Sequence, residues 1–528
     1  MHLGGHDSSC CVLKNNEIEL FFLEERYSRI KHHCHLQNCV DKVLDNLSGK
    51  VDLITIPTFY RKHNPTEYLS YFLKEYSKYF SNIPKVYKDF YHHRQHASLA
   101  FYNSGFDRAA VVVIDGHGSN FFTKNENDLK ECETIYEVSY PANFKTVYKK
   151  LLCNSNKKQS QYEQLVKKRN LDIDIFLGLG IGQLYDLASY AIGDSIFAAG
   201  KAMGLSSYGN DIAIDLNNSK ITTDEPLNSI NFQSYADYCK SIQKLTEEKA
   251  CGLIEKTIQK TNASNICITG GYAMNIIANK RYLDQFPNVN FYFEPLANDI
   301  GNSIGSGLFY FYKHSKTHDK RSLEHTSFHG TLHTLPTKGK SCNSKEVAQE
   351  LFKSKSVGIF YKKAEAGQRA LGHRSILFNP FDNECKEKVN LIKKREWYRP
   401  FAAIVLREDV GKLFYVNNKF FDRYMTVCYS AKPLAQKKIS GILHVDNTCR
   451  LQIVDSDHHL YKLLKEFKVI TGLGILLNTS MNIAGEPLVE NPNQALKMLR
   501  NTDLDYVYFL ERQLLTSDQH ITTIQRQV

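Results

Sequence analysis

Short apolar runs that end in a small or polar residue recur along the chain and alternate with helix-like stretches. The runs are VDLITI, AAVVVIDG, NICITGG, SVGIFY and GILLN. Strands that alternate with helices predict an α/β fold. Several runs end at Gly, Asp or Asn, the strand-end position where α/β folds bind their ligands. The pattern therefore predicts both the fold class and the edge at which to look for a site.

The length of 528 residues predicts more than one domain, because single hydrophobic cores stop growing near roughly 250–300 residues. Between residues 314 and 345 the strand–helix pattern gives way to polar and turn-forming residues. We therefore expect a first domain at 1–325, a second at 345–515 and a loosely held tail at 516–528.

Composition excludes several classes of protein. The chain is 42% hydrophobic and 23% charged, as in ordinary globular proteins. No apolar run approaches the ~20 residues that cross a bilayer, and no signal peptide is evident, so no membrane partner is expected. The 13 cysteines include no C-x-x-C pair, which favours reduced thiols in a cytoplasmic protein over a zinc ribbon.

A lysine-rich segment at 144–170 carries much of the net charge of +11, with eight basic residues and one acidic residue. Such a run is typical of a solvated helical face. It could instead contact a polyanion such as nucleic acid, with Tyr148 and Tyr162 stacking on bases. The sequence leaves both interpretations open.

Two histidines and an aspartate predict a metal site. His92 and His96 are four residues apart, so on a helix they share one face. Asp115 ends a strand that is buried by its own composition, and a carboxylate there needs a partner. Two nitrogens and an oxygen, with further positions left open, suit iron, manganese or zinc in a catalytic site. His93 points elsewhere and is expected to be structural.

Three glycine-containing segments accompany these residues. They are GGHDSS with His6 and Asp7, AAGKAMGLSSYG with Lys201, and ITGGYAMN with Gly270 and Gly271. Glycines at a strand end let the main chain approach a nucleotide closely.

The second half of the chain is rich in basic residues beside glycines and buried-type residues. Arginines in such a setting indicate a preorganised polyphosphate pocket, since the guanidinium group binds phosphate oxygens bidentately. The candidate residues, including three polar residues that follow an apolar strand, are Arg369, Arg374, Lys393, Arg395, Arg399, Arg450, Asn478, Ser480 and Asn482.

The order and spacing of these motifs resemble the O-carbamoyltransferases, the family of the nodulation and tobramycin/cephamycin carbamoyltransferases. Its N-terminal half is similar to the universal tRNA threonylcarbamoyl-transfer protein, a two-lobed actin/Hsp70-like (ASKHA) fold. Its C-terminal half looks like the YrdC fold. The resemblance spans about residues 3–512, with Gln368 where the family usually has proline and His373 where asparagine is common. The 144–170 segment looks like an insertion.

The resemblance implies roles for individual residues. His6, beside Asp7, matches a histidine near the acceptor and is a candidate general base. The implied metal ligands are His92, His96, Asp115 and Asp299, with Fe²⁺ expected before Mn²⁺ or Zn²⁺. The implied nucleotide contacts of the first domain are Lys201, Gly270, Gly271 and Asn275.

The resemblance also implies a two-step reaction. ATP, with Mg²⁺, and carbamoyl phosphate would give carbamoyl adenylate in the second domain, and the first domain would transfer the carbamoyl group to an acceptor hydroxyl. The acceptor could be a sugar or antibiotic, or a hydroxymethylated pyrimidine of a nucleotide or nucleic acid. A tRNA threonylcarbamoylation enzyme and an Hsp70-like binding protein are rival interpretations, and a homodimer is left open.

Overall fold

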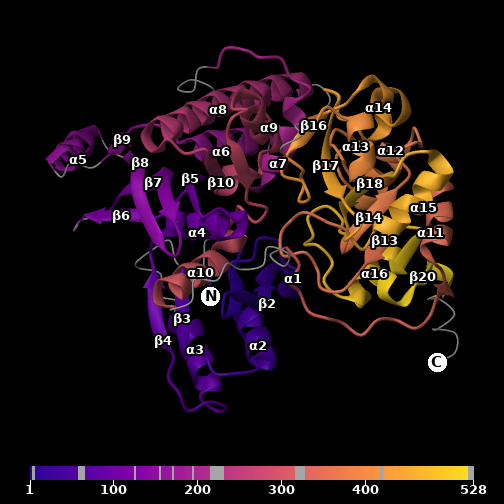
Figure 1. The fold of residues 1–528 in the computed structure, drawn as a ribbon, viewed down its shortest axis with the longest axis horizontal. Coiled ribbons are helices and arrows are strands. Elements are labelled where there is room, and N and C mark those ends of the chain that lie inside the picture. The colour runs from indigo at the N-terminus through magenta and orange to yellow at the C-terminus, as the bar shows by residue number, and fades with distance from the viewer. Residues whose placement is uncertain are drawn as a thin grey trace. The chain divides into compact units, whose positions relative to one another are not determined.

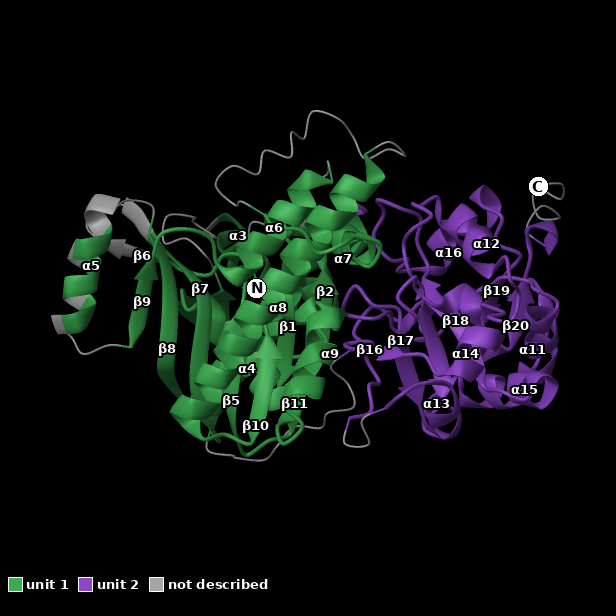
Figure 2. Cartoon of the chain, turned by 90° about the horizontal axis from the view of Figure 1, so that it is seen from above, with its two compact units in different colours: residues 1–28, 32–326 green, residues 29–31, 327–528 purple. Residues whose placement is uncertain are grey.

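A computed structural model gives the fold of residues 1–2, 6–57, 66–123, 126–153, 156–168, 172–192, 196–214, 231–315, 327–416 and 420–520. The chain forms two compact units (Figure 2). Unit 1 contains residues 1–28 and 32–326, and unit 2 contains residues 29–31 and 327–528. The division falls inside the polar stretch at 314–345, of which 316–326 lies outside the described residues. Both units mix helices and strands, so the predicted α/β class is confirmed.

Unit 1 contains a mixed sheet of seven strands in the order β11-β10-β5-β7-β8-β9, with β6 paired to β7. Two smaller sheets pair β1 with β2 and β3 with β4. The strands are β1 (Ser9–Lys14), β2 (Glu17–Leu23), β3 (Leu53–Pro57), β4 (Lys85–Asp89), β5 (Arg108–Ile114), β6 (Asn120–Thr123), β7 (Glu126–Ser139), β8 (Asn143–Cys153), β9 (Ile173–Phe176), β10 (Asn265–Thr269) and β11 (Asn290–Phe293).

The helices of unit 1 are α1 (Glu24–Ser28), α2 (Gln37–Asn46), α3 (Thr66–Tyr76), α4 (His92–Ser104), α5 (Asn156–Lys168), α6 (Ile181–Ala191), α7 (Ala199–Ser206), α8 (Phe232–Thr261), α9 (Ile276–Gln285) and α10 (Asn302–His314). No described helix of either unit combines the length and the apolar character that crossing a membrane requires.

Strand β5 is an interior strand of the seven-stranded sheet, between β10 and β7, and its carboxyl end positions Asp115. Its β-branched residues suit a strand that is buried on both faces. β5 runs parallel to β10, so the carboxyl ends of both strands meet at one edge of the sheet. Asp115 follows one strand and Gly270 follows the other. The strand-end arrangement that the sequence predicted is therefore present.

Helices α4 and α10 pack closely, which brings their first turns together (Figure 1). A methyl group on Gly305 would lie 2.0 Å from the carbonyl oxygen of Gln95, so only glycine permits this approach. α4 also carries His92 and His96, and α10 follows the short 3₁₀ helix that Asp299 begins. The crossing of the two helices thus places histidines and aspartate side by side.

The lysine-rich segment at 144–170 is not one helical face. Its first part is strand β8, which pairs with β7, and only residues from Asn156 onward form helix α5. On β8, Lys149 pairs with Glu131 and Lys150 with Glu133. Local charge counting missed these pairs because the glutamates lie on the neighbouring strand.

Unit 2 is built on a nine-stranded sheet in the order β12-β20-β19-β13-β14-β18-β15-β17-β16. Its strands are β12 (Lys340–Ser341), β13 (Val357–Phe360), β14 (Arg374–Phe378), β15 (Ala402–Leu406), β16 (Cys428–Ser430), β17 (Thr448–Val454), β18 (Ile475–Ser480), β19 (Tyr506–Phe509) and β20 (Leu514–Thr516). Its helices are α11 (Ser344–Phe352), α12 (Cys385–Lys393), α13 (Arg407–Leu413), α14 (Pro433–Lys438), α15 (Tyr461–Thr471) and α16 (Pro492–Asn501).

The core of unit 2 contains central strand residues such as Ile359, Ile404 and Leu476, packed with Leu464 and Phe467 of α15. Thr516, the first residue of the expected tail, belongs to β20. Residues 521–528 of that tail lie outside the described residues.

Candidate active site

Four side chains from three segments of unit 1 converge on one point. His92 and His96 lie on the first two turns of α4, Asp115 follows β5, and Asp299 begins the short 3₁₀ helix before α10. Their relative exposures are 0%, 0%, 7% and 4%. One polar atom from each lies within 4.8 Å of the others. The four residues expected to bind a metal are therefore together and buried.

The spacing of these atoms suits a single bound ion. The Nε2 atoms of His92 and His96 are 3.1 Å apart. His92 Nε2 lies 3.0 Å from Asp115 Oδ2 and 3.3 Å from Asp299 Oδ1, and His96 Nε2 lies 3.6 Å and 3.3 Å from the same two oxygens. Metal–ligand bonds of about 2.0–2.2 Å place neighbouring ligands roughly 3–3.5 Å apart. The donor set and its spacing fit a divalent transition metal.

The electrostatics of this cluster are strongly coupled. Burial alone would lower the pKa of His92, but the charge of Asp299 and hydrogen bonds with Asp115 and Asp299 outweigh it and raise the pKa to about 10. Burial alone would raise the pKa of Asp115, but hydrogen bonds with His92 and His96 hold it well below its ordinary value. The carboxylates are thus kept ionised, the form in which they can bind a cation.

Asn302 is a further polar residue in this cluster. Its amide nitrogen lies 3.2 Å from Asp299 Oδ1 and 3.4 Å from His96 Nε2, while its amide oxygen is buried and has no hydrogen-bond partner among the described residues. His96 Nδ1 is also buried without one. Buried polar atoms without partners cost free energy, and such atoms gather where a ligand completes a site.

The glycines predicted after β10 hold Asp115 in place. The main-chain N–H of Gly271 donates to Asp115 Oδ1 at 3.0 Å, which leaves Oδ2 for the cluster. Gly270 has φ +89°, and a methyl group there would lie 2.3 Å from the carbonyl oxygen of Ile114. The sequence predicted these glycines as nucleotide contacts. In this structure Gly271 bonds Asp115, and Gly270 allows the main chain to approach the end of β5.

The other predicted nucleotide contacts are differently placed. Asn275 caps helix α9, because its side-chain oxygen accepts from the N–H groups of Ile277 and Ala278, and its amide also bonds Gln243. These bonds give Asn275 a structural role. Lys201 lies half-buried on α7.

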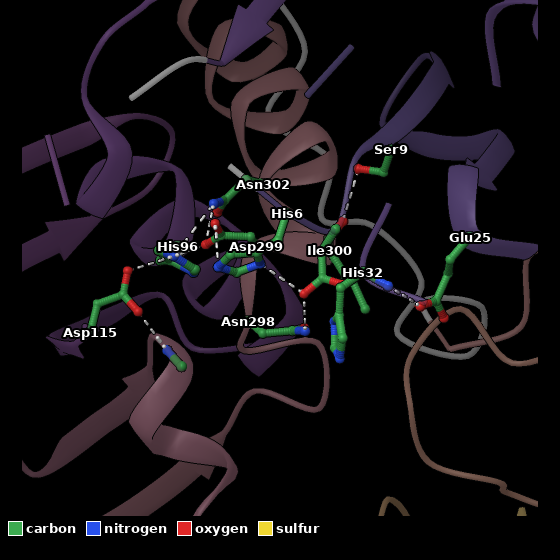
Figure 3. A network of polar contacts seen from close by, with 12 residues as sticks. His6, Ser9, Glu25, His32, His96, Asp115, Asn298, Asp299, Ile300 and Asn302 are labelled. Carbon is green, nitrogen blue, oxygen red and sulfur yellow. Dashed lines mark hydrogen bonds and ion pairs between the residues drawn. The ribbon is translucent and has the colours of Figure 1, made fainter. Parts of the chain in front are cut away.

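His6 lies beside the cluster (Figure 3) and bonds the neighbouring Asp7. His6 Nδ1 is 3.0 Å from Asp7 Oδ2, and its Nε2 is 3.9 Å from Asp299 Oδ2. Burial alone would lower the pKa of His6, but the hydrogen bond with Asp7 and the charge of Asp299 raise it to about 9. His32 bonds the other oxygen of Asp7 at 2.8 Å. Gly4 and Gly5 of the same motif lie outside the described residues.

Unit 2 gathers positive charge. Burial and then the charge of Arg450 lower the pKa of Arg369, and burial and then Arg399 lower that of Arg395. Burial and then Arg395 lower the pKa of Lys393. These residues are therefore close enough for their like charges to repel one another. We call this set, Arg369, Lys393, Arg395, Arg399 and Arg450, the anion pocket.

The polar residues after β18 support the anion pocket. The ammonium group of Lys393 donates to Asn482 Oδ1 at 3.0 Å and to Ser480 Oγ at 3.2 Å. Asn478 donates to Gln452 at 3.0 Å. In the part of the chain that the structure describes, the side-chain oxygen of Asn478 and the Nε of Arg450 are buried and have no hydrogen-bond partner. The sequence predicted these residues as phosphate contacts, and the structure shows two of them holding Lys393.

Arg374 is a correction to the sequence prediction. Its guanidinium group is fully buried over the ring of Phe360 and donates to the main-chain carbonyls of Tyr361, Lys362 and Glu490. Each of its terminal nitrogens thus serves the fold, so Arg374 is structural rather than a phosphate ligand.

Sequence reasoning missed several residues of these sites. Asn302 stands three residues after Asp299 in ANDIGNS, a helical spacing that could have indicated it. His32 lies in the stretch LEERYSRIKHH at residues 23–33, for which the sequence predicted no role. Asp186 of α6 left no local signal; burial and then the charge of Asp115 raise its pKa to about 7. Asp422, whose charge acts on Arg369 and Arg450, left none either.

Comparison with known protein families gives two matches. Residues 212–308 match the family described as the carbamoyltransferase N-terminus, and residues 348–516 match the carbamoyltransferase C-terminus. Together the matches cover half of the chain. The first contains Asp299 and Asn302, and the second contains the anion pocket.

Individual relatives agree with these matches. An uncharacterized protein from Methanocaldococcus jannaschii is 25% identical, covering 95% of this chain and 96% of the relative. The nodulation protein NolO from Bradyrhizobium diazoefficiens is 26% identical, covering 78% and 76%. Among solved structures, full-length HypF in the phosphate- and nucleotide-bound form is 12% identical, with TM-score 0.36, covering 59% and 55%. The chain belongs to the carbamoyltransferase family and is a transferase.

Proposed function

We propose that the protein is an ATP-dependent O-carbamoyltransferase with one reaction in each unit. Unit 2 makes carbamoyl adenylate from ATP and carbamoyl phosphate. Unit 1 transfers the carbamoyl group to an acceptor hydroxyl. The observation that carries this proposal is the buried convergence of His92, His96, Asp115 and Asp299 in a carbamoyltransferase.

His92, His96, Asp115 and Asp299 would hold a divalent ion, with Fe²⁺ expected first and Mn²⁺ or Zn²⁺ as alternatives. Such an ion supplies Lewis acidity toward the carbamoyl oxygen. The protein's own part is to keep both carboxylates ionised and to exclude water. Gly271 fixes the orientation of Asp115, and Asn302 bonds Asp299.

The anion pocket would bind ATP, with Mg²⁺, and carbamoyl phosphate. These are two anions that repel each other, and several fixed positive charges offset that repulsion. Lys393 is held by Ser480 and Asn482 before any ligand arrives, so little reorganisation is needed on binding. The products of this step are carbamoyl adenylate, pyrophosphate and phosphate.

In unit 1 the acceptor oxygen attacks the carbamoyl carbon, and AMP leaves with the electron pair of the broken bond. His6 lies between Asp7 and Asp299, where a positive charge would also favour the departing phosphate.

We favour a small-molecule hydroxyl as the acceptor over a nucleic acid. Tyr148 and Tyr162, the candidates for base stacking, are buried with exposures of 3% and 8%. Lys149 and Lys150 are paired with glutamates. Both observations weaken the argument for a polyanion contact at the lysine-rich segment.

The test is to incubate the purified protein with ATP, carbamoyl phosphate, Mg²⁺ and Fe²⁺, together with a panel of monosaccharides, nucleosides and aminocyclitols. We expect carbamoyl mass addition to one acceptor class and pyrophosphate release that depends on carbamoyl phosphate. Bicarbonate and threonine form the control arm: product from these substrates instead would indicate a threonylcarbamoylation enzyme and contradict the proposal.

A further inference from the structure

We propose that Asp186 receives the acceptor hydroxyl in unit 1 and takes its proton during transfer. This inference rests on the proposed function and adds a residue to that site. It is argued from the position of the carboxylate and from its lack of a partner.

Asp186 lies directly over the strand end that carries Asp115. Helix α6 starts against this strand end, because a methyl group on Gly182 would lie 2.5 Å from the main-chain carbonyl of Asp115. One turn later, Asp186 reaches across residue 116, where a methyl group on Gly116 would lie 3.3 Å from Asp186 Oδ2. The carboxylate therefore lies beside the residue that follows Asp115.

The carboxylate of Asp186 is half-buried and unused. Across the described part of the chain, no hydrogen bond or ion pair reaches it. A half-buried carboxylate without a donor carries a desolvation cost that a donor on a ligand would offset. An acceptor hydroxyl is such a donor.

The neighbouring groups are already engaged. His6 Nδ1 bonds Asp7 at 3.0 Å. His6 Nε2 lies 3.9 Å from Asp299 Oδ2, too far for a hydrogen bond but near enough for the carboxylate to favour a proton that is already on the imidazole. Asp7 is bonded by His6, His32 and Asn298. Asp115 and Asp299 are committed to the cluster. Asp186 is the carboxylate beside this site that remains open among the described residues.

Exposed aromatic rings lie close to the same place. Phe197 stacks on His32 at 4.0 Å and meets His6 edge-on at 5.3 Å, yet remains 44% exposed. Tyr190 follows Asp186 by one turn on α6 and is 53% exposed. An acceptor that presents an apolar ring face beside its reactive hydroxyl would fit this surface.

The step balances as follows. The acceptor O–H bond breaks and its proton goes to Asp186. The acceptor oxygen forms the new bond to the carbamoyl carbon, and the bond from that carbon to the phosphate oxygen of the adenylate breaks. AMP leaves with that electron pair, and Asp186 later returns its proton to solvent.

The decisive variant is Asp186→Asn, which keeps the shape of the side chain and removes its capacity to accept a proton. We expect transfer to the best hydroxyl acceptor of the panel to fall by about 100-fold or more, the usual contribution of a proton-accepting group. Bound metal and the formation of hydroxyurea with hydroxylamine, which traps carbamoyl adenylate, should match the wild type. The control is Asp211→Asn, the same change at an exposed carboxylate that pairs with Lys244.

A second variant tests the geometry alone. Gly116→Ala would place a methyl group 3.3 Å from Asp186 Oδ2 and push the carboxylate aside. We expect transfer to fall by about 3- to 10-fold, with unchanged hydroxyurea formation and bound metal. A methyl group that leaves transfer at the wild-type rate would count against the position assigned to Asp186.

Failure of this inference can be distinguished from failure of the proposed function. Transfer by Asp186→Asn within threefold of the wild type, or loss of bound metal in that variant, would overturn the inference alone. A wild-type protein that forms hydroxyurea but carbamoylates no hydroxyl would contradict both.

Discussion

The two units gather charged groups of opposite sign, carboxylates in unit 1 and arginines with a lysine in unit 2. Unit 1 buries Asp115 and Asp299 beside two histidines. Unit 2 gathers Arg369, Arg395 and Arg450, which are half-buried and close enough for their like charges to lower the pKa of Arg369 and Arg395. Burying like charges together costs free energy, which a ligand of the other sign offsets. This contrast supports our proposal of a cation at the site of unit 1 and of polyanions at the anion pocket of unit 2.

Within unit 2, two arginines differ in what their guanidinium groups bond. The Nε of Arg450 is buried and meets no hydrogen-bond acceptor within the described ranges, whereas Arg374 donates to several main-chain carbonyls. Arg374 is fully buried and Arg450 is half-buried, but the degree of burial does not say what either arginine binds. The identity of their partners distinguishes the two.

The largest expected effect is on the metal cluster. His96→Ala should lower carbamoyl transfer by at least about 1,000-fold, since a Lewis acid contributes several kcal/mol to such a step. Pyrophosphate release should stay within about twofold, because the anion pocket belongs to the other unit. Bound metal, measured by mass spectrometry, should fall as well.

The matched control for this prediction is His35→Ala, at an exposed histidine that contacts Tyr68. It should keep full activity and full metal content. Wild-type transfer by His96→Ala would remove the metal from the mechanism.

The next effect concerns the anion pocket. Arg450→Ala should lower pyrophosphate release that depends on carbamoyl phosphate by at least about 10-fold, since one lost charged hydrogen bond costs roughly 1.5–3 kcal/mol. Arg369→Ala should behave in the same way. Metal content should not change in either variant.

Arg374→Ala sharpens this prediction, because it removes an arginine of the same unit that serves the fold. We expect reduced stability in urea, while the fraction that remains folded keeps most of its pyrophosphate release. If Arg450→Ala keeps wild-type release and Arg374→Ala loses it without loss of stability, the assignments are reversed.

A smaller effect is expected from the buried His373 of unit 2, whose pKa is shifted in the direction opposite to that of His92 and His96 in the cluster of unit 1. Burial, partly opposed by a hydrogen bond to the carbonyl of Lys363, lowers the pKa of His373 to about 3. Between pH 6.5 and 3 this histidine is therefore protonated in the unfolded chain and neutral in the folded chain. The free energy of unfolding decreases as the pH falls through this range. At pH 5 this amounts to about 2 kcal/mol.

His373→Asn should remove that part of the pH dependence. Urea unfolding at pH 7.5 and pH 5, followed by the fluorescence of Trp397, reports on unit 2 because Trp397 is the single tryptophan of the chain. The variant should lose less stability between the two pH values than the wild type. Equal losses would mean that His373 takes up its proton while folded.

The sequence predicted the elements whose signal is local. The apolar runs of β5 and β10 and the four-residue spacing of His92 and His96 are fixed by neighbouring residues. Asp299 was predicted as a ligand only through the family resemblance, because nothing in the neighbouring sequence places it beside the histidines of α4. The distinction between Arg374 and Arg450 could not be predicted, since it depends on carbonyl groups brought near by the fold.

The smallest expected effect concerns the lysine-rich segment, where the sequence interpretation was furthest from the structure. Lys145 and Lys150 face Glu137 and Glu133, so their charges are largely compensated. Replacing both by glutamine should leave any DNA or RNA binding, and its salt dependence, unchanged within about twofold.

A second variant replaces the lysines of α5, which are Lys157, Lys158, Lys167 and Lys168. If wild-type affinity falls steeply with salt and the α5 variant shows a much shallower slope, those lysines neutralise phosphates and a nucleic-acid acceptor becomes the better proposal. We expect instead weak binding with the same slope in all three proteins, as a small-molecule acceptor requires.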